Sequence, residues 1–115
     1  MNLAKICSSL LVCWATAASA QGSFALYGAG TASCGQYLSQ TATGDADFIR
    51  MYEGWLQGFL SGMNVASRLR GGEMVLLPEV RSLLPYMTRY CRENPSSTFM
   101  AGSMTLARDF NLHRF

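Results

Sequence analysis

The sequence predicts an all-α fold, a small bundle of four to five helices stapled by one disulfide. Apolar residues recur at helical spacing through most of the chain, and no segment shows the strict alternation that a half-buried strand needs. Capping residues and glycines mark where several of these helical segments begin and end. The chain has 115 residues, 50% of them hydrophobic, which is enough for one small helical domain, expected over 33–115.

Residues 1–20 have the layout of a secretory signal peptide. Lys5 precedes an apolar run over residues 6–15, and Ala18 and Ala20 occupy the small-residue positions before a cleavage site. The run is too short for a transmembrane helix, which needs about 20 apolar residues. We therefore expect cleavage after Ala20 and a periplasmic location, with no membrane span in the mature chain.

The mature chain, residues 21–115, keeps two of the four cysteines, Cys34 and Cys91. In an oxidising compartment two such cysteines pair by default, and two free thiols are the alternative. The chain-entropy model gives about 4 kcal/mol for closing a loop of that length, a large share of the stability of a small domain. We therefore expect a disulfide between Cys34 and Cys91.

The mature chain carries eight arginines, no lysine and seven carboxylates, so its net charge at neutral pH is +1. No basic stripe points to a nucleic-acid partner. His113 stands alone near the C-terminus, and no clustered set of His, Cys, Asp and Glu has the spacing of a metal site. Because both mature cysteines are expected to be oxidised, we predict no catalytic residues, no cofactor and no enzyme activity.

The first helix follows a short lead-in. Residues 21–32 are rich in small side chains and are expected to be flexible. Ser33 and Gln36 match a capping box, in which the serine bonds a free amide of the first turn. The first helix is therefore expected from Cys34 to about Thr41, and Gly44 ends it.

The second helix is expected from about Ala46 to Arg68, with Asp45 as its cap. At 100° per residue its large apolar side chains fall on one stripe, which is a candidate for the core or for a binding surface. The members of this stripe are Phe48, Tyr52, Trp55, Phe59 and Met63.

Three glycines, Gly54, Gly58 and Gly62, lie four residues apart on the flank of the second helix. Each costs about 1 kcal/mol against alanine inside a helix, so the row needs a reason. A row without side chains lets another backbone approach closely, as in membrane helices. Two alternatives stay open: the first or last helix of the same chain packs into the row, or the row faces a second copy or another partner.

A glycine-rich break follows the second helix, and a proline divides what comes next. We expect a short turn near 78–83 and then a helix from Pro85 to Glu93, because proline disfavours helix in the residue before it. A serine at 96 or 97 is expected to cap the last helix, which runs to about Asn111.

Two stretches carry a resemblance to a known family. One is SCGQYL at 33–38, and the other is LPYMTRYCRENP at 84–95. With the GGEMVLL segment before the second stretch, they resemble the HdeA/HdeB family of small periplasmic acid-stress chaperones. That family bridges a cysteine near the start of helix one to a second cysteine late in the chain, and Cys34 and Cys91 match those positions.

The resemblance implies a homodimer at neutral pH that loosens in acid and then holds unfolding client proteins. The client surface would include the apolar side chains around Trp55, Phe59 and Met63. Protonation of the carboxylates would raise the mature charge to about +9, counting His113, and self-repulsion would favour opening. The candidate pH sensors are Asp45, Asp47, Glu53, Glu73, Glu79, Glu93 and Asp109.

The central helix is similar to that of a second group, the Rap1a/Tai immunity proteins. These small secreted helical proteins carry a glycine-rich run in the central helix, and GFLSG at 58–62 fits it. This resemblance implies a protein that binds and neutralises a secreted toxin. Two functions therefore stay open, an acid-stress chaperone and, as the alternative, an immunity protein. Both act by binding protein clients or one protein partner.

Overall fold

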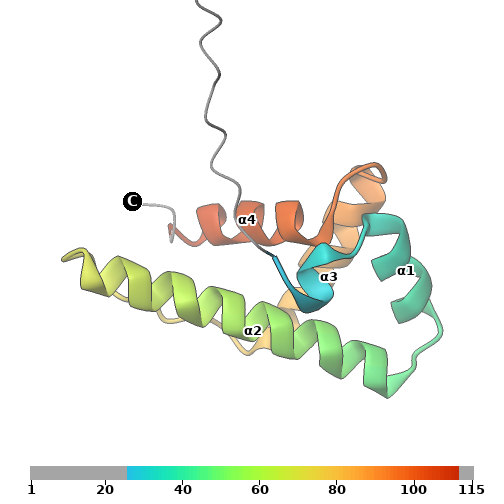
Figure 1. The fold of residues 1–115 in the computed structure, drawn as a ribbon, viewed down its shortest axis with the longest axis horizontal. Coiled ribbons are helices and arrows are strands. Elements are labelled where there is room, and N and C mark those ends of the chain that lie inside the picture. The colour runs from blue at the N-terminus through green and yellow to red at the C-terminus, as the bar shows by residue number, and fades with distance from the viewer. Residues whose placement is uncertain (1–25, 112–115) are drawn as a thin grey trace, which may run out of the picture.

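Four α-helices and one short 3-10 helix form the regular structure of residues 26–111, the part of the chain that this computed structural model describes (Figure 1). In chain order they are η1 (Gly28–Thr31), α1 (Cys34–Ala42), α2 (Ala46–Leu69), α3 (Val80–Glu93) and α4 (Phe99–Asp109). No strand is formed between residues 26 and 111, so the predicted all-α bundle is confirmed. The predicted signal peptide, residues 21–25 of the lead-in and His113 lie outside the described residues. The rest of the lead-in, which was expected to be flexible, includes η1.

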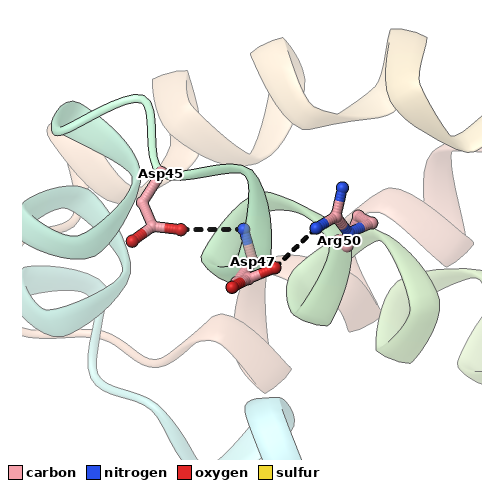
Figure 2. Close-up of polar contacts among 3 residues, drawn as sticks. All are labelled: Asp45, Asp47 and Arg50. Carbon is pink, nitrogen blue, oxygen red and sulfur yellow. Dashed lines mark hydrogen bonds and ion pairs between the residues drawn. The ribbon is translucent and has the colours of Figure 1, made fainter.

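The first two α-helices begin as the sequence predicts. The Ser33 hydroxyl accepts a hydrogen bond from the Gln36 amide at 3.0 Å, which satisfies a free donor in the first turn of α1. The Asp45 carboxylate accepts from the Asp47 amide at 2.8 Å at the start of α2 (Figure 2). Between the two helices, Gly44 adopts a left-handed conformation with φ 71° that other residues rarely take.

The predicted break before Pro85 is wrong, because α3 is one helix that passes through the proline. Proline removes one amide donor and costs about 3 kcal/mol inside a helix. Leu83, Met87 and Cys91 are buried at four-residue spacing along α3, so the helix is held to the core on both sides of the proline. Pro85 itself is exposed, and burial of the opposite face outweighs its local cost.

The last helix is capped by Thr98, whose hydroxyl accepts from the Ala101 amide at 3.1 Å, one or two residues after the predicted serine. The reason lies in the preceding turn. There the Ser97 carbonyl accepts from the Cys34 amide, and the Phe99 amide donates to the Ala32 carbonyl, both at 2.9 Å. This pair of bonds joins the start of α1 to the start of α4. The described helix ends at Asp109, slightly before the predicted end.

The core is built around three aromatic rings from three helices. Tyr37 of α1, Tyr52 of α2 and Phe99 of α4 are fully buried, and their ring centres lie 4.8–4.9 Å apart. The hydroxyl of Tyr52 donates to the Gln40 side chain at 2.6 Å, so its polar end is satisfied. Aromatic contacts of this kind add to the free energy gained from burial alone.

The disulfide between Cys34 and Cys91 is present and completely buried beside this core. It links the first residue of α1 to the end of α3 across 57 positions of sequence. In the chain-entropy model a closed loop of this length contributes about 4 kcal/mol. The predicted staple is confirmed, and it fixes the two helices that flank the pocket described below.

Candidate functional site

The glycine row of α2 faces outward. Figure 1 shows α2 along one side of the molecule, with α1, α4 and η1 on its other side. A Cβ atom added to Gly54, Gly58 or Gly62 would meet nothing within 4 Å. No part of the chain between residues 26 and 111 packs into the row, so the intramolecular alternative is wrong for the described structure. The row is left for a second copy or another partner.

The outward face of α2 is also free of charge along its middle. Between Met51 and Val65 the only side chain that is charged at neutral pH is Glu53, which is turned inward and buried. Charged residues stand at the ends, where Asp47 pairs with Arg50 (Figure 2) and Arg68 is exposed. We call the outward stripe of this helix the α2 face. Its members are Met51, Gly54, Gly58, Gly62, Val65 and Leu69.

The loop after α2 turns back along the helix and is clamped to it by one side chain. Asn64 donates to the Val75 carbonyl at 2.7 Å and accepts from the Val75 amide at 2.8 Å. Val75 points toward the core, so its neighbours Met74 and Leu76 point outward, as alternation along an extended chain requires.

Four large apolar side chains of the second half of α2 and of the loop clamped to it are exposed. Together they form what we call the apolar tip, with exposed fractions of 53% for Val65, 82% for Leu69, 63% for Met74 and 96% for Leu76. No surface was predicted at MVLL, residues 74–77, which entered only the family resemblance as part of GGEMVLL. The available signal was an apolar run placed between a glycine-rich break and a proline, where a loop would normally be polar.

The apolar stripe of α2 was a candidate for the core or for a binding surface, and in this structure Trp55, Phe59 and Met63 pack against the core. Trp55 and Phe59 stack with ring centres 5.3 Å apart, and both are half-buried, as are Phe48 and Met63. The segment around η1 covers the stripe, because the Trp55 indole donates to the Tyr27 carbonyl at 2.9 Å. The indole is also so close to η1 that a Cβ added to Gly30 would lie 2.1 Å from its ring.

Two of the seven predicted pH sensors connect helices. Glu53 of α2 is nearly buried, and its carboxylate accepts from Nε of Arg81 on α3 at 3.1 Å. Asp109, at the end of α4, accepts from the Tyr86 hydroxyl of α3 at 2.6 Å. Asp45 and Asp47 serve the start of α2, as described above. The remaining three, Glu73, Glu79 and Glu93, have exposed side chains.

Three tyrosines have raised pKa values. Burial raises the pKa of Tyr37, and burial followed by the nearby Tyr37 raises that of Tyr52. Burial, together with the hydrogen bond and negative charge of Asp109, raises the pKa of Tyr86 to about 12. All three hydroxyls therefore stay protonated at neutral pH and act as hydrogen-bond donors.

A pocket of about 530 Å³ opens between α1 and α3. Its walls are mainly apolar, and arginines of α3 stand at its rim. Among residues 26–111 there is no group of three or more His, Cys, Asp and Glu side chains that could hold a metal ion. Within the same residues, no helix combines the length and the apolar character that crossing a bilayer requires.

No family model, curated protein or solved structure matches this chain. The family resemblances therefore stay predictions that rest on the cysteine-bearing stretches and the glycine run of α2. The arrangement in the structure offers surfaces for binding, namely the α2 face, the apolar tip and the pocket.

Proposed function

We propose that this chain is a disulfide-stabilised protein-binding protein that works in the periplasm. The observation that carries the proposal is the apolar tip, where Leu69, Met74 and Leu76 are each more than half exposed. Large apolar side chains this exposed, on the second half of α2 and on the loop clamped along it, favour an interaction surface. The Asn64 clamp supports the proposal further, because it orders the loop before any partner arrives and so lowers the entropy cost of binding.

The apolar tip is exposed while the protein is fully folded, which favours binding of one partner at neutral pH. Such binding is expected of an immunity protein of the Rap1a/Tai type, which needs no acid-driven opening. The uncharged α2 face continues from the tip along the helix, so a partner could contact both regions. We therefore place the immunity-type function first and propose that its partner is a secreted protein.

Site-specific photo-crosslinking in the producing cell tests this proposal. A crosslinker placed at Leu69 or Leu76 should yield one discrete adduct with another protein, while the same group at Ser39 on α1, also exposed, should yield none. Equal adducts from all three positions, or no adduct from the tip, would contradict a specific surface there.

A second copy of the chain also fits the α2 face. When two α2 helices run antiparallel with Gly58 on a two-fold axis, the same patch meets itself, as a symmetric dimer requires. Small residues then face each other in the centre, and opposite charges approach at both ends. The opposed pairs are Gly54 with Gly62 and Met51 with Val65, and Asp47 comes within one residue of the position opposite Arg68. A Gly58→Arg substitution would block this dimer, and sedimentation of both forms tests it.

The acid-stress chaperone remains the second candidate, supported by two contacts. Protonation of Glu53 and Asp109 would weaken the links from α3 to α2 and from α3 to α4. With the mature charge near +9 in acid, opening would uncover Trp55 and Phe59 while the disulfide limits unravelling.

Light scattering of an unrelated client separates the two candidates. A chaperone should suppress aggregation at about pH 2.5, below the carboxylate pKa values, and lose that ability at neutral pH. An immunity protein should give no such gain in acid.

A further inference from the structure

The pocket between α1 and α3 has the size and lining of a small-molecule site. Its volume of about 530 Å³ lies within the range that such sites usually occupy. Leu38 and Ala42 of α1 form one wall, Leu84 and Pro85 of α3 form the other, and Ile49 of α2 closes one end. It shares no residue with the α2 face or the apolar tip.

The hydroxyl groups in the pocket wall already have partners inside the protein. The Tyr37 hydroxyl lies 3.0 Å from the Thr88 hydroxyl and 3.3 Å from the Leu84 carbonyl that accepts from it. The Thr41 hydroxyl donates to the Tyr37 carbonyl at 2.7 Å. A ligand that offered only neutral hydroxyl or amide groups would therefore have to compete with existing hydrogen bonds.

The other polar side chains that line the pocket are arginines. Arg81, at one end, donates to Glu53. Arg89 and Arg92 lie one turn apart at the other end, both exposed, and the Arg89 guanidinium rests 5.4 Å from the centre of the Tyr86 ring. Stacking on a ring leaves guanidinium N–H groups available for an anion. No carboxylate lines the pocket within the described residues.

We propose that this pocket binds a small amphiphilic anion, with its apolar chain along Leu38 and Leu84 and its head at Arg89 and Arg92. Burial of the chain supplies affinity in proportion to the apolar area removed from water. Charge-assisted hydrogen bonds from two arginines fix the head, which is a carboxylate or a phosphate. This function is separate from the binding of a protein partner and does not depend on it.

Head-group comparison provides the first test. The mature, disulfide-bonded protein is titrated with decanoate, decyl phosphate, decanol and decyltrimethylammonium, each below its micelle-forming concentration. Binding is followed by calorimetry and by amide shifts in α1 and α3. The two anions should bind saturably, at least about tenfold more tightly than decanol, and the cation should not bind. Equal affinity for all head groups, or no saturable binding of either anion, would overturn the proposal.

Variants locate the site. Arg89→Gln with Arg92→Gln should weaken anion binding at least about tenfold, because both head contacts are lost. Ala42→Trp should weaken it by filling the pocket mouth. Arg68→Gln removes the same charge from the far end of α2 and should leave affinity unchanged. All four residues are exposed, so the fold should persist, and melting curves check this. Unchanged affinity in both pocket variants would contradict the assignment.

Vesicles distinguish a free ligand from a membrane surface. In cosedimentation with phosphatidylglycerol vesicles, the parent protein and the variant Arg89→Gln with Arg92→Gln should behave alike. The reason is that the pocket binds a single ligand molecule from solution and not a membrane surface. Binding to vesicles without saturable binding of decanoate or decyl phosphate would replace the pocket with an electrostatic lipid contact and overturn the proposal.

Discussion

Gly102 of α4 and Gly58 of α2 both lie inside helices, but their surroundings are opposite. A Cβ added to Gly102 would lie 2.8 Å from the Met87 side chain and 2.7 Å from the Tyr90 ring, so the glycine lets α3 and α4 come close together. A Cβ added to Gly58 would meet nothing within 4 Å. The first glycine serves the packing of this chain, whereas the second has no role that the described chain reveals.

The comparison shows that the molecule keeps destabilising glycines on the exposed face of α2. Each exposed glycine of α2 weakens the helix by about 1 kcal/mol relative to alanine, without any packing contact in return. Natural proteins often keep such costs at functional positions. The packed side of the molecule holds the disulfide and the aromatic core, and the open side holds the α2 face and the apolar tip.

The largest expected effect comes from adding bulk to the packed glycine. Gly102→Val forces branched methyl groups against Met87 and Tyr90, so we expect a loss of about 2 kcal/mol from overpacking. Gly58→Val is the matched control and should change stability by only a few tenths of a kcal/mol, or about 0.5 at most, in the stabilising direction. Urea unfolding measures both. A similar loss of unfolding free energy in Gly102→Val and Gly58→Val would contradict the view that only Gly102 is packed.

A smaller loss is expected at the clamp beneath the apolar tip. Asn64→Ala leaves the amide and the carbonyl of Val75 without their partner, which should cost about 1 kcal/mol. Hydrogen exchange of residues 73–77 should become faster at the same time. Gln57→Ala, on the exposed side of the same helix, serves as the control. Unchanged exchange in Asn64→Ala would show that the loop does not depend on this side chain.

The smallest expected effect is a fall in stability at alkaline pH that comes from Tyr86 on α3. The folded pKa of Tyr86, raised from 10.0 to about 12, means that the folded state holds this proton more tightly than the unfolded state. Its contribution to stability is therefore complete below pH 10 and is lost as pH rises toward 12. Thermal melting across this window should show a decline, and the decline should be smaller in Tyr86→Phe. An equal decline in that variant would assign it to other groups.

Local patterns predicted most of the fold. Ser33, Asp45 and Gly44 act where capping and turn chemistry place them, and the pairing of Cys34 with Cys91 follows from the number of cysteines in the mature chain. The continuous helix through Pro85 was not predicted. Burial of Leu83 and Met87 in the core outweighs the local cost of the proline, and a rule based on neighbouring residues does not include that burial. The Thr98 cap was missed because long-range bonds to α1 set the preceding turn.

The candidate site was harder to predict, since it depends on what lies opposite each helix face. The glycine row was recognised, but sequence spacing cannot tell an open row from a packed one. The stripe around Trp55 was left open between core and binding surface, because its cover by η1 comes from contacts between segments far apart in sequence. The apolar tip depends on the Asn64 clamp, which has no recognisable local motif.

The stability of a triple variant tests the central claim most directly. The claim is that the α2 face is open in the folded chain and is kept for a partner. Gly54→Ala, Gly58→Ala and Gly62→Ala are combined, and unfolding in urea is measured at a concentration where sedimentation shows monomers. We expect a gain of about 3 kcal/mol over the parent chain, because helix propensity improves at three positions and nothing is displaced. A loss of similar size would mean that the row is packed within the chain.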